Sequence, residues 1–157
     1  RDFELSFEWK VAAGAYSGVK FIVSEEMSVS HPPPRAALGF ELQILDDDLH
    51  PDARNGPNRT AGALYDLVEP AAGKRLEPVG SFNRSRIVFV GGRGEHWLNG
   101  ERVVAFDLAS EDFAQRFARS KYVPYEGFAD VREGHIVLQD HGDEVWFRDL
   151  KVREMRP

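Results

Sequence analysis

The sequence predicts an all-β fold, an antiparallel sandwich of two sheets with one short helix. Many short segments alternate between apolar and polar residues, with the period of two that a half-buried strand requires. Turn-forming residues separate these segments at short intervals, which is typical of a sandwich. A length of 157 residues is enough for one domain with its own core. No repeat or low-complexity tract divides the chain, so residues 1–157 are expected to form a single domain.

The N-terminal segment carries the clearest strand pattern. From Phe3 to Val11 every second residue is apolar, and polar or charged residues occupy the positions between them. The glycine-containing stretch 13–18 predicts a turn, and Val19–Val23 is the strand that returns from it. The segment His31–Pro34 is predicted to be a loop, because proline lacks a backbone donor and has a fixed φ.

The rest of the chain continues the same pattern. Further strands are expected at Gly39–Leu45, Gly62–Leu67, Arg86–Val90, Glu95–Leu98, Arg102–Phe106, His135–Gln139 and Val145–Val152. The only helix is expected at Ser110–Arg119, where Ser110 can cap the first turn and Phe113 and Phe117 are four residues apart. Apolar residues on the inward phase of the strands should form the core: Phe3 or Leu5, Phe7, Phe40, Leu42, Ile44, Ile87, Phe89 and Phe147.

Composition excludes several classes of function. The net charge is −6, and no basic block provides the cationic face that a nucleic-acid partner needs. No apolar run reaches the ~18 residues of a membrane span. The chain has no cysteine, which excludes disulfides and zinc–thiolate sites.

A polar cluster follows the strand predicted at 39–45. Glu41 and Gln43 point off one face of this strand, which is either a solvent-exposed face or a ligand-binding one. The strand then runs into five acidic or imidazole side chains: Asp46, Asp47, Asp48, His50 and Asp52. Oxygen ligands with an imidazole could hold a divalent cation, although the spacing is not that of an EF-hand. The alternative is an acidic loop whose aspartates cap turns.

A second polar cluster ends a strand near the C-terminus. It contains Gln139, Asp140, His141 and Asp143. If the two strand ends meet at one rim of the sandwich, Asp46, Asp47 and His141 would share a site. Contacts between carboxylates and an imidazole shift pKa values and can supply general acid–base groups.

Three further side chains are candidates for binding a ligand. His96 and Trp97 are neighbours on one strand, so they face opposite sides and one of them is expected in the core. A tryptophan on an open face could stack on a ring of a bound ligand, whereas an inward one would only fill the core. Arg148 could contact a substrate oxygen or form a surface ion pair that contributes little.

Six segments of the chain carry a resemblance to a known family. They are QILDD (43–47), HPD (50–52), GALYD (62–66), GEHWLNGERVV (94–104), ARSKY (118–122) and HIVLQDHGDEVWFRDLKVRE (135–154). Together they resemble the bacterial 3-keto-disaccharide hydrolase domain family. The resemblance implies a concanavalin-like jelly roll, a periplasmic or secreted location, and a preceding segment that supplies the N-terminal strand or strands.

The resemblance also implies a carbohydrate substrate and a chemistry. Glycosides oxidised to a ketone at C3 would be cleaved, because the ketone acidifies the C2 proton and a single base can remove it. The implied catalytic residues are Glu41, Asp46 and His141; the implied binding residues are Gln43, Asp47, Tyr65, His96, Trp97, Gln139 and Arg148. Glu41 or His141 would be the base. Asp46, Asp47 or a divalent cation held by them would orient the ketone.

Other mechanisms fit the sequence less well. The Ser-His-Asp arrangement, the GxSxG motif and the P-loop are all missing, and the glycines at 91–94 lie in a hairpin rather than between a strand and a helix. Retaining glycosidases need two carboxyl groups about 5 Å apart, but segment 41–46 has one glutamate and an aspartate five residues on. The alternatives to an enzyme are a lectin-like carbohydrate-binding module and, less favoured, a structural or adhesion domain.

Overall fold

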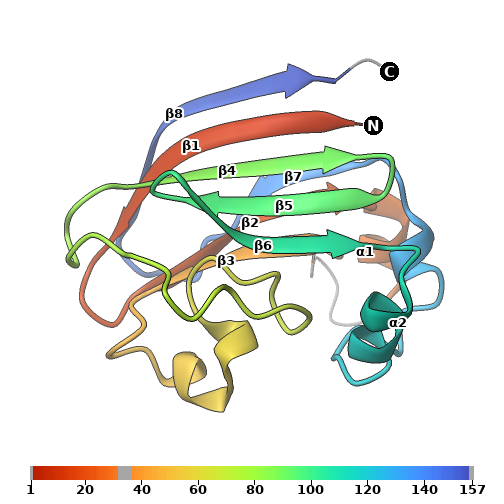
Figure 1. The fold of residues 1–157 in the computed structure, drawn as a ribbon, viewed down its shortest axis with the longest axis horizontal. Helices are drawn as coiled ribbons and strands as arrows, with labels where there is room; N and C mark the ends of the chain where they lie inside the picture. The colour runs from red at the N-terminus through yellow and green to blue at the C-terminus, as the bar shows by residue number, and fades with distance from the viewer. Residues whose placement is uncertain (1, 32–36, 156–157) are drawn as a thin grey trace.

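The computed structural model describes residues 2–31 and 37–155 and consists of two antiparallel sheets packed face to face (Figure 1). The five-stranded sheet has the order β6-β5-β4-β1-β8, and the three-stranded sheet has the order β3-β2-β7. The strands are β1 (Phe3–Val11), β2 (Tyr16–Val23), β3 (Phe40–Leu45), β4 (Asn83–Val90), β5 (Arg93–Leu98), β6 (Glu101–Asp107), β7 (His135–Leu138) and β8 (Val145–Glu154). The predicted all-β jelly-roll sandwich is confirmed.

Most elements lie where the sequence pattern predicts them, with three differences. A second short helix, α1 (Glu25–Ser30), precedes β3 and was not expected, because six residues are too few for a helical period to be visible. Residues 17 and 18 belong to β2 rather than to a turn. In the segment expected as a strand at 62–67, only Leu64 forms strand-like bridges, and turns make up the rest.

The remaining helices are short. Helix α2 (Glu111–Phe117) is capped by Ser110, as predicted. Three 3₁₀ helices, η1 (Pro51–Asn55), η2 (Pro57–Arg59) and η3 (Phe128–Asp130), lie in the connections. The proline residues of the loop predicted at His31–Pro34 lie outside the described residues.

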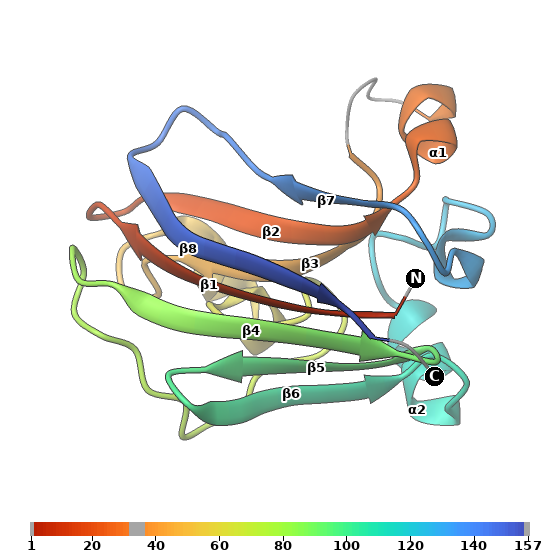
Figure 2. The ribbon, with the colours of Figure 1, turned by 90° about the horizontal axis from the view of Figure 1, so that it is seen from above.

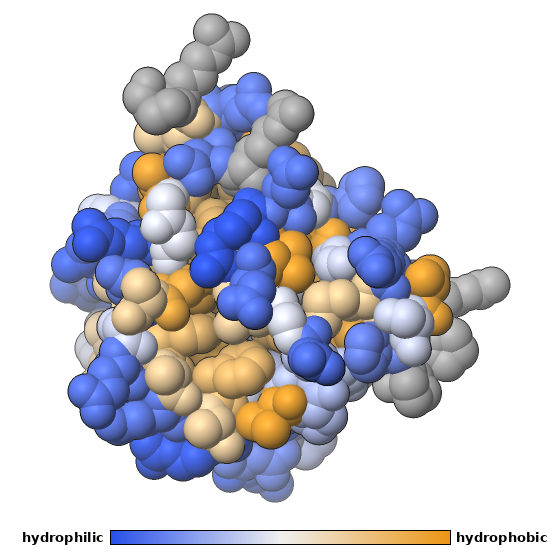
Figure 3. Space-filling model, turned by 90° about the vertical axis from the view of Figure 1, so that its right-hand side faces the viewer, coloured by the Kyte–Doolittle hydropathy of each residue, from blue (hydrophilic) through white to orange (hydrophobic). Residues whose placement is uncertain are grey.

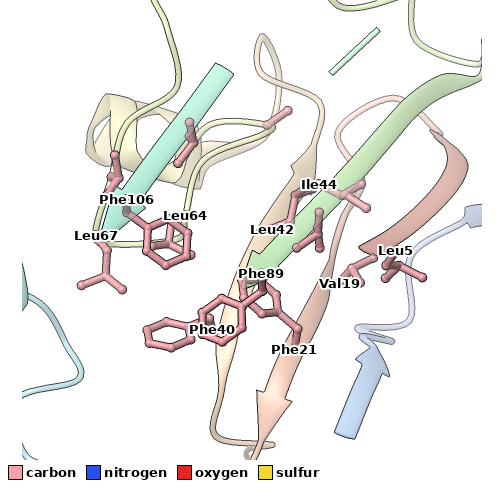
Figure 4. Close-up of a cluster of buried hydrophobic side chains, with 14 of the residues drawn as sticks. Leu5, Val19, Phe21, Phe40, Leu42, Ile44, Leu64, Leu67, Phe89 and Phe106 are labelled. Carbon is pink, nitrogen blue, oxygen red and sulfur yellow. The ribbon is translucent and has the colours of Figure 1, made fainter. Parts of the chain in front are cut away.

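The core lies between the two sheets and is rich in phenylalanine (Figure 4). The ring centroids of Phe21 and Phe40 are 5.8 Å apart, and those of Phe89 and Phe106 are 6.4 Å apart. Tilted and edge-on ring contacts at such distances add to the stabilisation that burial alone provides. Among the residues predicted for the core, Phe147 is only partly buried and the others are buried.

Both faces of β3 are covered. Its apolar side chains face the core, while Glu41 and Gln43 point to the opposite side and are nevertheless only 4% and 1% exposed. The cause is the connection 46–68, which pairs alongside β3: Tyr65 N–H donates to the Glu41 carbonyl (2.9 Å) and Gln43 N–H to the Ala63 carbonyl (3.1 Å). The outer face of the three-stranded sheet therefore holds buried polar groups.

One long side of the sandwich is open. Strands β7 and β8 are the edges of the two sheets on the same side of the molecule (Figure 2). Leu138 pairs with the buried Val19, and Val152 with the buried Leu5, so both side chains face the core, yet they are 40% and 64% exposed. A hollow of about 660 Å³ lies at this opening. Figure 3 views the end of the sandwich where β1 begins and shows apolar surface among the charged side chains.

No helix in the described part of the chain is both long and apolar enough to cross a membrane.

Candidate active site

Five of the predicted site residues lie on the outer face of the three-stranded sheet: Glu41, Gln43, Tyr65, Gln139 and His141. In β2, Lys20 lies opposite Glu41 of β3, and Gly18 accepts a hydrogen bond from the backbone N–H of Gln139, just beyond β7 (3.0 Å). The side chains of Glu41 and Gln139 meet above Gly18. A Cβ at Gly18 would lie 2.5 Å from Glu41 Oε1 and 2.7 Å from Gln139 Oε1, so a larger residue would push them apart.

A hydrogen-bonded chain joins a carboxyl group to an imidazole. The Gln139 side chain hydrogen-bonds to the Glu41 carboxyl group, and its Oε1 lies 3.3 Å from Nε2 of His141. An amide oxygen can only accept, so we assign the proton of a neutral His141 ring to Nε2. The Gln139 amide then donates to Glu41, and Nδ1 of His141 is left with a lone pair.

Burial sets the protonation of Glu41. Desolvation raises its pKa, while Lys20, Lys121 and the hydrogen bond from Gln139 act against that rise. The Nζ atom of Lys20 is 3.8 Å from Glu41 Oε2. A carboxyl group with a raised pKa is better matched to proton transfer near neutral pH than a solvated one.

His141 belongs to a stack of three rings at the rim of this face. Tyr16 lies between His50 and His141, with ring centroids 4.3 Å and 4.2 Å away. Tyr16 is also held by its backbone N–H, which donates to Asp143 Oδ2 (3.1 Å). Desolvation and the nearby Lys20 lower the pKa of His141, so its ring is mostly neutral at pH 7.

A second network supports the site from the side of Tyr65. The Tyr65 hydroxyl donates to Asp52 Oδ2 (2.8 Å) and accepts from Arg59 Nη1 (2.9 Å). Arg59 also bonds Asp52 Oδ1 (3.1 Å) and Asp66 Oδ1 (2.8 Å). Burial opposes ionisation of Asp52, but hydrogen bonds from Asn55, Tyr65 and Arg59 together lower its pKa. Asp52 is therefore a fixed negative charge.

Gln43 lies beneath these groups. Its Nε2 donates to Asp52 Oδ2 (3.4 Å) and to the Arg59 carbonyl (3.3 Å). Its Oε1 is buried and has no hydrogen-bond partner within the described part of the chain. An unpaired acceptor of this kind is costly, and such groups often belong to functional sites.

Asp46 and Asp47 lie elsewhere. Asp46 accepts hydrogen bonds from the backbone N–H groups of Gly14 (2.9 Å), Asp48 (3.0 Å) and Leu49 (3.2 Å). Asp47 pairs with Lys74 (2.6 Å). Both line a separate cavity of about 330 Å³ at one end of the sandwich. Within residues 2–31 and 37–155, no group of three or more His, Asp or Glu residues could hold a metal ion. Asp46 thus caps the turn after β3.

Three other predicted site residues are not brought to Glu41. His96 is fully buried between the sheets, where Nδ1 lies 3.0 Å from the Gly62 carbonyl, and burial lowers its pKa to about 4. Trp97 faces the opposite side of β5 and stacks under Arg86 (4.2 Å). Arg148 pairs with Glu8 across the five-stranded sheet. All three residues lie on the five-stranded sheet, whereas Glu41 points to the outer side of the three-stranded one. His96 and Trp97 are neighbours on β5, so Trp97 points away from the core when His96 points into it.

The sequence reasoning missed several residues that surround Glu41. Lys20 faces Glu41 only because of the register between β2 and β3, which no local pattern reveals. Tyr16 begins a strand and gave no signal of its own. Arg59 and Lys121 come from connections; Lys121 lies in the segment ARSKY, which contributed to the family resemblance but was not considered chemically.

Fold and site together define a jelly-roll domain with a buried carboxyl group linked to an imidazole on the outer face of its smaller sheet. The chain belongs to the family of 3-keto-alpha-glucoside-1,2-lyase-like domains, whose model matches residues 1–153.

Relatives of known name agree with this assignment. A 3-keto-disaccharide hydrolase from Bacteroides thetaiotaomicron is 34% identical over 98% of this chain. This chain spans 58% of the length of that relative. Two crystal structures of a "putative glycosyl hydrolase" from Parabacteroides distasonis match 99% and 98% of this chain, and this chain covers 70% and 78% of theirs. Their TM-scores are 0.86 and 0.76, at 29% and 28% identity.

A more distant structure shares the fold alone. A carbohydrate-binding module from Bacillus subtilis matches 98% of this chain and 75% of its own length, with a TM-score of 0.59 and 11% identity.

Proposed function

We propose that the protein cleaves 3-keto-glycosides by removing the C2 proton, eliminating the C1 substituent and then adding water. The observation that supports this most directly is the Glu41–Gln139–His141 chain, which joins a buried carboxyl group to an accessible imidazole. The activity in the name of the Bacteroides relative agrees with the proposal. The substrate is a carbohydrate already oxidised at C3.

Glu41 is the base in this mechanism. Its carboxylate takes the proton from C2, and the electrons of the C–H bond move into an enolate whose charge rests on the C3 oxygen. When the ketone re-forms, the bond from C1 to the leaving oxygen breaks, and a double bond remains between C1 and C2. Water then adds across that double bond and gives the free 3-keto sugar.

His141 is the acid that protonates the leaving oxygen. It lies at the rim, where it is exposed, and Tyr16 and Gln139 hold its ring in place. Because its pKa is lowered, its protonated form is a stronger acid than an ordinary histidine. The lowered pKa also means that little of His141 is protonated at neutral pH. Proton donation by His141 should therefore affect the rate most when the leaving group is poor.

The geometry favours this route over direct hydrolysis of an ordinary glycoside. Such hydrolysis needs two carboxyl groups acting together, one of them protonated or nucleophilic. The charged carboxylate in the adjoining network, Asp52, has its oxygens engaged by Asn55, Arg59 and Tyr65. Because the oxygens of Asp52 are already engaged, Glu41 is the carboxyl group that suits proton transfer. A single base is enough for cleavage only when a ketone at C3 activates the C2 proton.

The first experiment compares oxidised and unoxidised substrates that differ in leaving group. We expect turnover of 3-keto-p-nitrophenyl glucoside and 3-keto-methyl glucoside, and none of the parent glucosides. Equal turnover of oxidised and parent sugars would contradict the proposal. Binding of either sugar without turnover would instead support a carbohydrate-binding module.

The second experiment distinguishes the proposed base, Glu41, from the proposed acid, His141. Glu41→Gln should lower kcat by ~10²–10⁴-fold for both leaving groups, because every substrate needs the base. His141→Ala should lower kcat by a similar factor for the 3-keto-methyl glucoside only, because nitrophenolate leaves without needing a proton. Controls are Glu95→Gln and His135→Ala, two residues outside the site that form their own ion pairs. The opposite pattern would make His141 the base.

A further inference from the structure

We infer that Lys121 is a third catalytic residue, which binds the C3 oxygen and stabilises the enolate formed when the C2 proton leaves. This inference rests on the proposed function. Proton removal puts a full negative charge on the C3 oxygen, and a cation or hydrogen-bond donor placed there in advance is usually the largest contribution to such a step. The candidates are the cations near Glu41.

Lys20 and Lys121 are the two lysines whose charges act on Glu41. Lys20 is already engaged: its side chain is 12% exposed, and its ammonium group lies 3.8 Å from Glu41 Oε2 and donates to the Ala37 carbonyl (3.1 Å). A substrate oxygen could reach it only by displacing these partners. Lys20 therefore suits the task of keeping Glu41 ionised.

Lys121 is placed differently. The residue is exposed, although desolvation lowers the pKa of its ammonium group despite the opposing charge of Glu41. The ammonium group lies over the ring of Tyr65, 4.1 Å from the centroid, and 5.1 Å from that of Tyr122. No carboxylate of the described residues lies within ion-pair distance of it. Ring faces attract a cation but leave its N–H groups able to donate to a ligand. Lys121 thus offers an accessible cation beside the base.

The backbone of Lys121 is anchored to the site. Its N–H donates to Asp66 Oδ2 (2.7 Å), and the other carboxylate oxygen of Asp66 accepts from Arg59 (2.8 Å). Asp66 has φ +61°, a region that residues other than glycine adopt rarely and at some energetic cost. Tyr65, which lies under the ammonium group, donates its N–H to the Glu41 carbonyl. One short path of contacts therefore fixes the positions of base and cation relative to each other.

A structural role for Lys121 predicts a different outcome from a catalytic one. If Lys121 only lowers the pKa of Glu41, its removal moves the acid limb of the pH–rate profile to higher pH and leaves the plateau rate unchanged. If it stabilises the enolate, the plateau itself falls, because the charge on the C3 oxygen lacks its partner at every pH.

The test measures kcat against pH for Lys121→Met with both 3-keto-glucosides. We expect the plateau to fall by ~10²–10³-fold for the nitrophenyl and the methyl substrate alike, and Lys121→Arg to recover part of it. Exchange of the C2 hydrogen in deuterated water should slow by the same factor. The control is Lys10→Met, since Lys10 makes a similar ring contact with Trp146 (4.3 Å) on the other sheet.

The results separate this inference from the function on which it rests. A wild-type protein that turns over neither keto-glucoside refutes the function before any variant is made. With an active wild type, a Lys121→Met plateau within twofold of it overturns the role of Lys121, as does Lys121→Arg being no better than Lys121→Met. If thermal melting shows Lys121→Met to be unfolded, Lys121→Gln replaces it.

Discussion

Glu41, the proposed base, illustrates how a residue placed for chemistry can oppose stability. Its carboxyl group is buried, and desolvation raises its pKa despite two nearby lysines. A group whose pKa is higher in the folded than in the unfolded chain stabilises the fold fully below the unfolded pKa, and this contribution is lost as pH rises through the folded pKa. At neutral pH the charged Glu41 therefore makes the folded state less stable than a neutral side chain of the same shape would.

We predict that Glu41→Gln raises the melting temperature at pH 8 and leaves it nearly unchanged at pH 4. Each unit of pKa shift corresponds to about 1.4 kcal/mol, which is roughly 3 °C for a domain of this size. Thermal unfolding followed by circular dichroism at several pH values checks this. A variant that melts below the wild type at every pH would show that the ionised carboxylate is favoured by its surroundings.

At the scale of elements, three neighbouring strands bring the proposed acid–base groups together. β3 contributes Glu41, the end of β7 leads to Gln139 and His141, and β2 runs between them with Gly18 at the crossing point. Because β2 has no side chain at Gly18, there is room above it for the side chains of Glu41 and Gln139 from the neighbouring segments. Mutating Gly18 should disturb the site more than the fold.

We predict that Gly18→Ala lowers kcat by about tenfold or more, because small displacements of acid–base groups are enough to do so. The melting temperature should change little, since alanine also reduces the entropy of the unfolded chain. Gly73→Ala is the control, because a Cβ at Gly73 meets nothing within 4 Å. Full activity of Gly18→Ala in the same assay would mean that the contact between Glu41 and Gln139 is not needed.

At the scale of the whole molecule, one long side of the sandwich exposes side chains that face its core. Strands β7 and β8 leave core-facing apolar side chains exposed. Among residues 2–31 and 37–155 no further strand pairs with their outer edges, and such edges are a known aggregation risk. This chain spans 58% of the Bacteroides relative, which therefore has residues without a counterpart here. We propose that further β-strands of the same polypeptide pair with these edges.

The proposal predicts that two substitutions act differently in two lengths of chain. Leu138→Thr and Val152→Thr together should hardly change the melting temperature of residues 1–157, and should reduce binding of a hydrophobic dye. In a longer chain that includes the covering strands, the same pair should cost about 2 kcal/mol or more, because it then places polar groups in a core. Equal effects in both lengths would count against a cover of this kind.

Much of the fold follows from local sequence. The period of two in residues 3–11 predicts β1 to the residue, Ser110 marks the start of α2, and alternation in 40–44 puts Glu41 and Gln43 on the face away from the core. Such features depend on neighbours in the chain, so the sequence contains them directly. The family resemblance rests likewise on short contiguous segments.

Only the tertiary structure determines which polar residues contact one another. Strand register places Lys20 and Gln139 beside Glu41, while Asp46 turns away to cap backbone N–H groups and His96 packs among phenylalanines. Register and sheet order depend on packing between segments far apart in sequence, and a shift of one residue would reverse every face. For that reason the sequence by itself determined most of the strands and the family of this protein, and only the folded chain determined the site.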